Sequence, residues 1–173
     1  MRHLVLGGAR SGNTRFAMAA AEQLAATPGL IVTAEPRDGE MADRIQKHQA
    51  ERGDHWGVCE APLELAVALR DAVERYNCVV VDCLTLWLSN CLEASVWGQQ
   101  RSEFLSLLND NCLEDKSLLM VSNEVGSGVV PLGALSRRYV DELGLLHQVI
   151  AALVEEVTLV VAGLPQSLKQ TLS

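Results

Sequence analysis

Eight consecutive residues near the N-terminus, residues 7–14, have the types and spacing that could bind phosphate. They stand between an apolar run and a helix-prone one and read Gly7, Gly8, Ala9, Arg10, Ser11, Gly12, Asn13 and Thr14. Glycines let the backbone wrap closely around phosphate groups, and the N–H groups at the start of a helix form a positive cradle. The segment therefore predicts a phosphate-binding loop, in which the Thr14 hydroxyl has the position that binds Mg²⁺. A glycine-rich turn without a ligand is the alternative.

One residue departs from the usual pattern of such loops, G-x-x-x-x-G-K-[ST], because Asn13 stands where lysine is expected. That lysine contacts the β and γ phosphates and stabilises charge during transfer, whereas asparagine is neutral and shorter. Arg10 and Arg15 flank the loop and could compensate in part. We therefore expect the backbone of the loop to bind phosphate without the electrostatic contribution of a lysine.

A second part of such a site is an apolar strand that ends in an acidic residue. Residues 78–82 read Cys-Val-Val-Val-Asp and predict a buried strand ending at Asp82. In phosphate-loop proteins the acidic residue at this place holds Mg²⁺ through water. Since an apolar strand that ends in aspartate is common by chance, the prediction depends on its pairing with the loop. We therefore predict a magnesium site at Thr14 and Asp82.

Among the four histidines, His48 is distinguished by its neighbours. Arg44 and Arg52 lie one helical turn before and after it, and Glu51 lies three residues after it. Two cations and an imidazole on one face could handle phosphate, and an imidazole nitrogen is a nucleophile at phosphorus that can pass the group on. From these residues alone, however, a solvated helix face with ordinary ion pairs is the favoured interpretation.

The elements that must position these residues alternate between short apolar runs and longer helical stretches. Strands are predicted at 3–6, 30–34, 78–82, 117–122 and 157–162, the last being the final strand, with an extra edge strand at 56–60. Helices are predicted at 15–26, 38–52, 62–76, 86–92, 101–113 and 137–156. This alternation predicts one α/β domain over residues 1–173, with a mostly parallel sheet and helices on both faces. In such sheets ligands gather beyond the carboxyl ends of the strands.

Composition narrows the classes of protein. The chain has 173 residues, of which 49% are hydrophobic and 21% charged, and this excludes a disordered chain, a collagen and a coiled coil. A net charge of −8 disfavours a non-specific nucleic-acid binder but leaves a mononucleotide site open. Five cysteines without a C-x-x-C pair favour reduced thiols over disulfides or zinc. With no signal peptide and no apolar run of membrane length, we expect no membrane span and a cytoplasmic protein.

Blocks of residues spread nearly from end to end of the chain together resemble one family. They lie at 7–12, 38–41 with 44, 45 and 48, 60–62, 81–90, 122–126, 137–144 and 160–165. Asp-Cys-Leu-Thr-Leu-Trp-Leu-Ser-Asn at 82–90 and Asn-Glu-Val-Gly at 123–126 are far more specific than a phosphate loop. On these blocks the chain resembles the adenosylcobinamide kinase/adenosylcobinamide-phosphate guanylyltransferase family of cobalamin biosynthesis.

The resemblance implies a P-loop (RecA-like) α/β fold, a homotrimer and two reactions. In the first, ATP or GTP phosphorylates the aminopropanol hydroxyl of adenosylcobinamide. In the second, GTP guanylylates a histidine with release of pyrophosphate, and the GMP passes to adenosylcobinamide phosphate to give adenosylcobinamide-GDP. The resemblance places the guanylylated histidine at His48 and Mg²⁺ at Thr14 and Asp82. Besides residues 7–14, the nucleotide contacts that it implies are Val32, Thr33, Ala34, Gln49, Ala50, Glu51, Arg52, Glu60 and Asp82.

Asn13, where the family pattern has lysine, keeps three hypotheses in view. The leading one is the bifunctional enzyme. The second is a guanylyltransferase with impaired kinase activity, because transfer of a γ-phosphoryl group depends on the missing charge. The third is a nucleotide-binding homologue without catalysis, and the presence of His48 and Asp82 weighs against it. Of the aromatic residues, Trp87 is expected in the core, and Trp97 is a candidate for the corrinoid pocket, whereas Glu124 is a candidate for orienting the acceptor hydroxyl.

Overall fold

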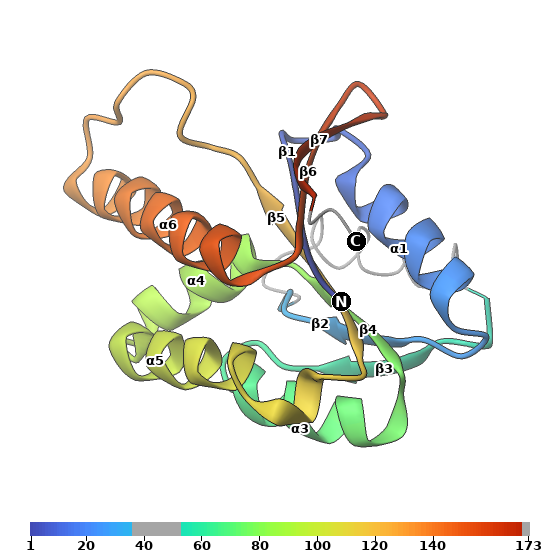
Figure 1. Ribbon diagram of the computed structural model, residues 1–173. Helices are drawn as coiled ribbons and strands as arrows, with labels where there is room; N and C mark the ends of the chain where they lie inside the picture. Colours follow the sequence, from blue (N-terminus) through green and yellow to red (C-terminus); the bar gives the residue numbers. More distant parts are fainter. Residues whose placement is uncertain (36–52, 171–173) are drawn as a thin grey trace.

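The computed structural model describes residues 1–35 and 53–170 (Figure 1). Within these residues the centre of the fold is a seven-stranded sheet with the order β3-β2-β4-β5-β1-β6-β7. The strands are β1 (Arg2–Gly7), β2 (Gly29–Val32), β3 (Gly57–Glu60), β4 (Cys78–Asp82), β5 (Ser117–Asn123), β6 (Glu156–Val161) and β7 (Leu164–Gln170). Strands β1 to β6 run parallel, and β7 pairs antiparallel with β6. The parallel strands therefore bring their carboxyl ends to one edge of the sheet.

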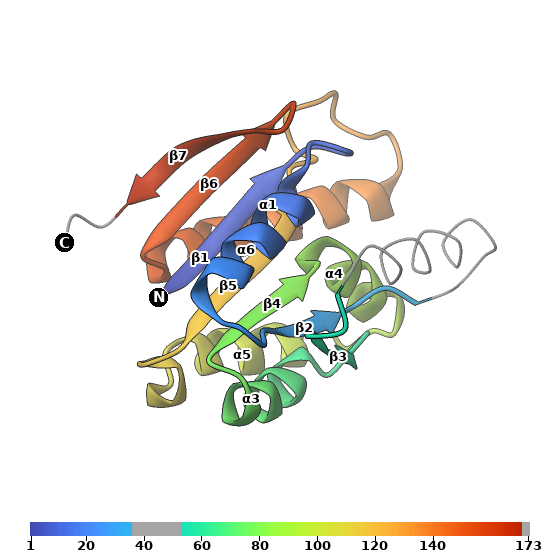
Figure 2. The same cartoon turned by 90° about the vertical axis from the view of Figure 1, so that its right-hand side faces the viewer.

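Helices cover both faces of this sheet, as the alternating pattern predicted. They are α1 (Asn13–Leu24), α3 (Leu65–Arg75), α4 (Leu84–Glu93), α5 (Trp97–Leu108), the short 3₁₀ helix η1 (Asn111–Leu113) and α6 (Ala134–Leu153). Figure 2 shows α1 in front of the sheet, with α3, α5 and α6 behind it. The predicted α/β class is thus confirmed.

The core is split between the two faces because successive residues of a strand point in opposite directions. Leu4 and Leu6 of β1 belong to the core beneath α3 to α6, whereas Val5 belongs to the core beneath α1. Strands buried on both faces read as continuous apolar runs, as residues 78–81 do. On the α1 side, the small and fully buried residues Ala17 and Ala21 let the helix lie close to the sheet.

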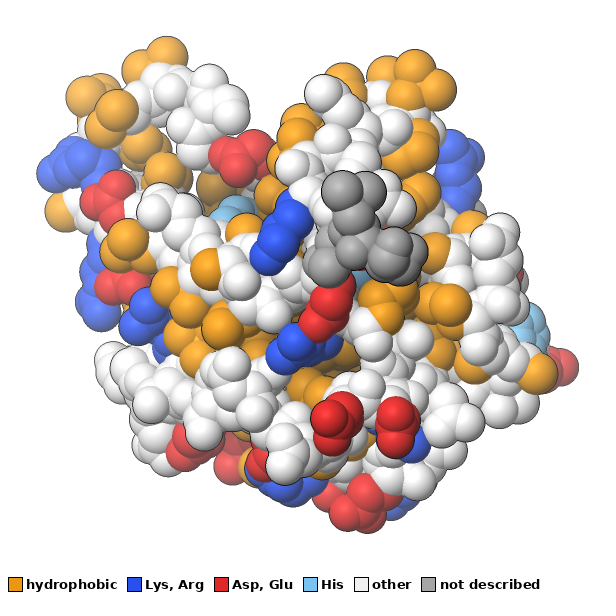
Figure 3. Space-filling model, in the orientation of Figure 1, with side chains coloured by type: hydrophobic (Ala, Val, Ile, Leu, Met, Phe, Trp, Pro, Cys, Tyr) orange, Lys and Arg blue, Asp and Glu red, His pale blue; other side chains and the backbone are white. Residues whose placement is uncertain are grey.

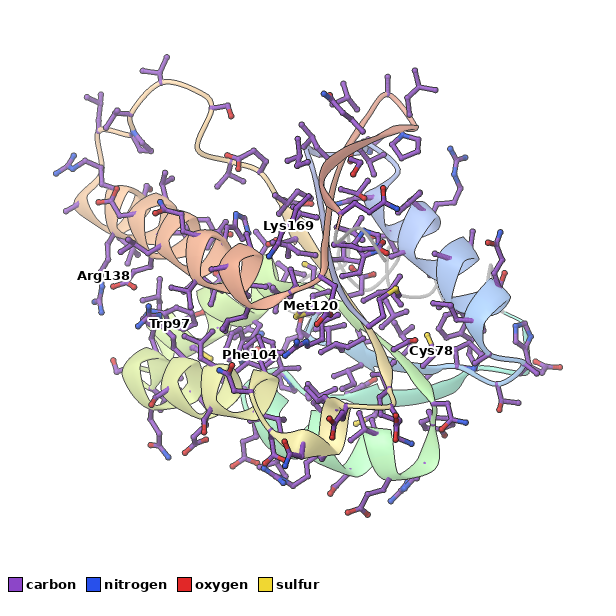
Figure 4. The ribbon with its side chains drawn as sticks, in the orientation of Figure 1. Cys78, Trp97, Phe104, Met120, Arg138 and Lys169 are labelled. Carbon is purple, nitrogen blue, oxygen red and sulfur yellow. The ribbon has the colours of Figure 1, made fainter. Side chains whose placement is uncertain are left out.

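An aromatic cluster joins α4, α5 and α6. The ring centroids of Trp87 and Trp97 lie 5.3 Å apart, and those of Trp87 and Phe104 lie 5.1 Å apart. Figure 4 shows Trp97 and Phe104 in the layer between α5 and α6. Both indole N–H groups donate within the protein, from Trp87 to the carbonyl of Leu63 and from Trp97 to Glu142. Trp87 is therefore a core residue as expected, and so is Trp97, which is 4% exposed and too buried to line a corrinoid pocket.

The C-terminal part of the sheet differs from the prediction, because residues 157–162 are not the final strand. Ala162 and Gly163, both with positive φ, turn the chain back into β7. Such a tight turn with a positive φ at both positions is typical of a two-residue hairpin. Lys169 of β7, labelled in Figure 4, donates its ammonium to the carbonyls of Ala151 and Val154 at the end of α6. This cap on the negative end of a helix holds β7 in place.

Several helix boundaries were also predicted wrongly. The helix expected at 101–113 begins at Trp97 and ends at Leu108, and Asp110 then caps η1 by accepting from the Cys112 N–H. Helix α4 begins two residues before the expected 86, and α6 spans Ala134–Leu153 rather than 137–156. The extra edge strand expected at 56–60 is confirmed as β3. The helix expected at 38–52 lies outside the described residues.

All five cysteines lie in the described part of the chain and are free, as expected. Among the described residues, no helix combines the length and apolar character that crossing a membrane requires.

Candidate functional site

The phosphate-binding loop joins β1 to α1 through a tight turn. A Cβ on Gly7 would collide with Ser11 Oγ and lie 2.9 Å from the carbonyl oxygen of Val160, so only glycine fits. Gly12 caps α1 with φ +94°, a left-handed conformation that favours glycine. The Gly163 N–H donates to the Ser11 carbonyl at 2.8 Å, which ties the loop to the β6–β7 turn. The described geometry is that of a loop which leads directly into a helix N-terminus.

Asn13 occupies the lysine position of this loop, but its side chain points into the protein. It is 6% exposed, and its Nδ2 donates to the Ser122 carbonyl at 3.1 Å and to Asn123 Oδ1 at 3.2 Å. Its Oδ1 accepts from the Thr14 N–H at 3.0 Å. Asn13 therefore binds the loop to the end of β5 instead of presenting a charge to phosphate. The sequence pattern showed the missing lysine but not these partners.

The two residues predicted to hold Mg²⁺ lie together. Thr14 Oγ1 donates to Asp82 Oδ1 at 3.3 Å, although the residues belong to α1 and to the end of β4. Hydroxyl and carboxylate oxygens are the hard ligands that Mg²⁺ takes in proteins, with water and phosphate oxygens filling the remaining positions. The pair thus fits a magnesium ion next to the loop.

Thr33, the residue after β2, is bonded to Asp82 and Cys83 at the carboxyl end of β4. It is fully buried, and its Oγ1 donates to the Cys83 carbonyl at 2.7 Å and accepts from the Cys83 N–H at 2.9 Å. Its backbone N–H donates to the Asp82 carbonyl, and its carbonyl accepts from Asn90 Nδ2. These contacts fix the Asp82–Cys83 corner and leave no polar group of the Thr33 side chain for a nucleotide.

The other predicted nucleotide contacts fall into two groups. Sheet register places Val32 beside both Glu60 and Asp82, so these residues share the carboxyl edge with the loop. Val32 is buried, Ala34 is half-buried and Glu60 is exposed. The predicted catalytic residue and four predicted contacts, His48, Gln49, Ala50, Glu51 and Arg52, lie outside the described residues. Their roles stay predictions.

A buried polar network behind the loop was not predicted. His147 Nε2 lies 2.7 Å from Ser122 Oγ, which lies 3.3 Å from Thr85 Oγ1, and Thr85 Oγ1 accepts from the Asn123 N–H at 2.8 Å. His147 Nδ1 lies 4.0 Å from Glu124 Oε2. Burial lowers the pKa of His147, and the Glu124 carboxylate opposes this shift. The sequence distinguished His48 among the histidines and not His147, and only the polar strand end at 122–124 signalled the partners of His147.

Two cations flank the loop as expected. Arg10 is exposed and has φ 57°. The Arg15 guanidinium lies along the β6–β7 turn, because a Cβ on Gly163 would be 3.4 Å from Arg15 Nη2. Figure 3 shows a cleft above this edge, between the segment that precedes α6 and the β6–β7 hairpin. The loop, the Thr14–Asp82 pair and Glu124 all lie at the strand ends that this cleft exposes. A site of this kind can hold a nucleoside triphosphate and admit an acceptor from the other side.

Comparison with known proteins agrees with this geometry. A family model for cobinamide kinase / cobinamide phosphate guanyltransferase (CobU) matches residues 3–168. The chain is 52% identical over 175 residues to the bifunctional adenosylcobalamin biosynthesis protein CobP of Pseudomonas aeruginosa, with 98% of each chain covered. It is 32% identical over 182 residues to the bifunctional adenosylcobalamin biosynthesis protein CobU of Escherichia coli, and this match covers 98% of this chain and 100% of that one.

Among solved structures, a KaiC-like protein from Pyrococcus horikoshii matches with a TM-score of 0.51 at 17% identity, covering 91% of this chain and 71% of that one. At this identity the likeness concerns the fold alone, and it agrees with the phosphate-loop architecture expected from the sequence. The extent of the family match and the identity to these relatives establish the family itself. The chain belongs to the cobinamide kinase / cobinamide phosphate guanyltransferase family of transferases.

Proposed function

We propose that the chain phosphorylates the aminopropanol hydroxyl of adenosylcobinamide and then transfers GMP from GTP to adenosylcobinamide phosphate. The observation that carries this proposal is the convergence of the phosphate loop with Thr14 and Asp82, 3.3 Å apart, in a chain of this family. Both reactions use a triphosphate, so one loop serves both in turn.

In the kinase step, the backbone N–H groups of the loop and the N-terminus of α1 hold the triphosphate. The acceptor oxygen forms a bond to the γ-phosphorus while the bond from that phosphorus to the β-phosphate oxygen breaks, and the hydroxyl proton leaves. Thr14 and Asp82 would hold Mg²⁺, which would supply positive charge beside the phosphate oxygens. Because Asn13 is neutral and bound to β5, Arg10 is the cation of the loop that can turn towards the γ-phosphate.

In the guanylyl step, an imidazole nitrogen of His48 bonds to the α-phosphorus of GTP, and pyrophosphate leaves. A phosphate oxygen of adenosylcobinamide phosphate then bonds to the same phosphorus, the N–P bond breaks and the histidine is regenerated. Residues 36–52 follow β2, whose carboxyl end lies at the edge that carries the loop, and this supports the assignment. A covalent intermediate lets GTP and the bulky corrinoid use overlapping space at different times.

A guanylyltransferase with impaired kinase activity is the second candidate. It is favoured by the commitment of Asn13 to hydrogen bonds with Ser122 and Asn123, which leaves the γ-phosphate without the usual lysine. The guanylyl step depends less on that charge, because it breaks the bond between the α and β phosphates. A homologue that binds nucleotide without catalysis is the third candidate.

Experiments with labelled nucleotides distinguish the three candidate functions. After incubation with Mg²⁺ and GTP labelled at the α-phosphate, the denatured chain should carry label that is acid-labile and alkali-stable, as a phosphoramidate is. His48→Ala should abolish the label. If this variant is still labelled, the nucleophile is another residue. Transfer from γ-labelled ATP or GTP to adenosylcobinamide then separates the bifunctional enzyme from the impaired kinase. If neither label transfers at saturating nucleotide, the chain binds without catalysis.

We also propose that the protein is a cytoplasmic homotrimer. The free cysteines agree with a reducing compartment. Strand β7 lies at the end of the sheet and exposes Leu164 and Leu168, which a neighbouring subunit would cover. Light scattering on the purified protein should give three times the mass of the chain.

A further inference from the structure

A groove of about 540 Å³ lies between α4 and α6 and includes Val125, two residues after the carboxyl end of β5. Its walls are mostly apolar and include Ser89 and Leu92 of α4, Val125 after β5, and Leu135, Tyr139 and Val140 of α6. The Tyr139 hydroxyl donates to the Thr85 carbonyl at 3.2 Å, which fixes one wall against the start of α4. The described part of the nucleotide site uses none of these walls.

The groove and the phosphate loop meet at Glu124. The Glu124 N–H donates to the Gly7 carbonyl at 3.0 Å, so its backbone is attached to the start of the loop. Its Oε1 accepts from the Gly126 N–H at 2.6 Å. A Cβ on Gly126 would lie 3.1 Å from Glu124 Oε1 and 3.9 Å from Val140 Cγ1. The Glu124 carboxylate therefore lies next to Gly126, which is also close to the groove residue Val140, and Glu124 directly precedes the groove residue Val125.

His147 restricts the position of this carboxylate. His147 is 8% exposed, and its ring is held by the bond between Nε2 and Ser122 Oγ, with Nδ1 4.0 Å from Glu124 Oε2. Because Gly126 holds one carboxylate oxygen and His147 faces the other, Glu124 has a defined orientation at the strand end. A carboxylate with this placement suits an incoming hydroxyl group, whose proton it can accept.

The segment that borders the groove exposes an apolar surface. Val129 and Leu132 are 96% and 98% exposed, and Val130 and Leu135 are 72% and 69% exposed. Figure 3 shows hydrophobic side chains gathered on this raised segment before α6. Apolar patches of this kind mark binding surfaces. Such walls suit a large and partly apolar ligand such as a corrinoid better than the charged phosphates of a nucleotide.

We propose that this groove is the acceptor site, which binds the corrinoid with its aminopropanol hydroxyl directed at Glu124. During phosphorylation the hydroxyl proton passes to a Glu124 oxygen as the O–P bond forms and the nucleoside diphosphate leaves, and solvent later takes the proton from Glu124. His147 is a positioning residue for that carboxylate. The inference rests on the proposed function, because it takes the corrinoid acceptor from it.

A bulky side chain in the groove tests the site. Ser89→Trp should fill the groove, and Ser106→Trp is its control, because Ser106 lines a second groove of about 470 Å³ between α3 and α5. In GMP transfer to adenosylcobinamide phosphate, we expect Ser89→Trp to raise the KM for the acceptor by about tenfold or more and the control to change it less than about twofold. Labelling of the chain by GTP needs no acceptor and should be unchanged in both variants.

The outcomes separate the inference from the proposed function. Absence of label in the wild type would refute the guanylyl proposal itself. Normal label with an unchanged acceptor KM in Ser89→Trp would overturn the groove as the acceptor site. If Ser89→Trp instead changes the mass of the assembly and leaves the KM unchanged, the groove is a contact between subunits, and this also overturns the proposal.

Glu124 and His147 are tested on the kinase step. Glu124→Gln keeps the shape of the side chain and should lower kcat for phosphorylation by about a hundredfold, with little change in the acceptor KM or in labelling by GTP. His147→Gln can still bond to Ser122 and should lower kcat by about tenfold, again with little change in the acceptor KM or in labelling by GTP. A loss of GTP labelling equal to the loss of kinase activity would overturn the role of Glu124, and so would a wild type that phosphorylates no acceptor at all.

Discussion

Replacing Asn13 with lysine tests how the phosphate loop works without its usual cation. The Asn13 side chain makes three hydrogen bonds inside the protein, two donated by Nδ2 and one accepted by Oδ1. A lysine chain lacks the acceptor and is longer, so we expect its ammonium to extend along the loop towards the β and γ phosphates. The substitution therefore removes contacts to β5 and adds charge where transfer occurs.

The two effects have opposite signs and can be measured separately. Loss of the donors leaves the Ser122 carbonyl and Asn123 Oδ1 unsatisfied, which should lower the free energy of unfolding without nucleotide by about 1–3 kcal/mol. The added charge should raise the rate of adenosylcobinamide phosphorylation by at least about tenfold, or about 1.4 kcal/mol in transition-state stabilisation. The assays are denaturant unfolding without nucleotide and steady-state transfer from γ-labelled ATP.

Asn13→Met is the matched control, because methionine has nearly the length of lysine without its charge. It should show the same loss of stability and no gain in phosphorylation. If Asn13→Lys binds nucleotide but phosphorylates adenosylcobinamide no faster than the wild type, the reasoning is refuted, and another residue already supplies the charge. An equal gain in both variants would show that release of the loop from β5, and not charge, limits the reaction.

Two further predictions concern the support of the site and the stability of the fold. Thr33→Val removes the acceptor of the buried Cys83 N–H and one donor to the Cys83 carbonyl, which keeps the Trp87 N–H. It should lower the free energy of unfolding by about 1–3 kcal/mol and weaken Mg²⁺-dependent GTP binding. Thr33→Ser should keep both properties, and wild-type stability and binding in Thr33→Val would contradict the proposed support. Hydrogen bonds from Arg2 lower the pKa of Glu155 to about 2, below its ordinary value of 4.5. Since the folded-state pKa is the lower one, the ionised carboxylate stabilises the fold fully above pH 4.5, and this stabilisation is lost as the pH falls from there towards 2. In Glu155→Gln, the free energy of unfolding measured between pH 4.5 and 2 should therefore depend less on pH than in the wild type.

The sequence predicted the parts of the site that depend on one strand and its following turn. Residues 78–82 form a continuous apolar run ending in aspartate, and residues 7–14 are a glycine-rich loop before a helix. Parallel strands then bring Thr14 and Asp82 to the same edge, where they lie 3.3 Å apart. No long-range contact had to be known in advance, because the parallel arrangement supplies it.

The parts that were missed depend on contacts between segments far apart in the chain. The partners of Asn13 lie at the end of β5, and those of His147 lie on β5 as well, so neither follows from local pattern. Strand β7 is mostly exposed and lacks a buried apolar run, and it is held by the turn at Ala162–Gly163 and by Lys169 on the end of α6. Helix α5 begins at Trp97, whose side chain packs on Trp87, a contact that spacing alone does not show.

The end of β5 joins the two halves of the proposed chemistry. Ser122 offers its carbonyl to Asn13 on the side of the loop and its hydroxyl to His147 on the side of the groove. Asn123 binds Asn13, and the next residue, Glu124, is attached to Gly7 and faces His147. We therefore expect a substitution that shifts this strand end to move both proposed binding sites, that of the triphosphate and that of the acceptor hydroxyl. In a loop without its lysine, we expect such alignment of the two reactants to supply part of the rate that charge would otherwise provide, because positioning lowers the barrier independently of electrostatics.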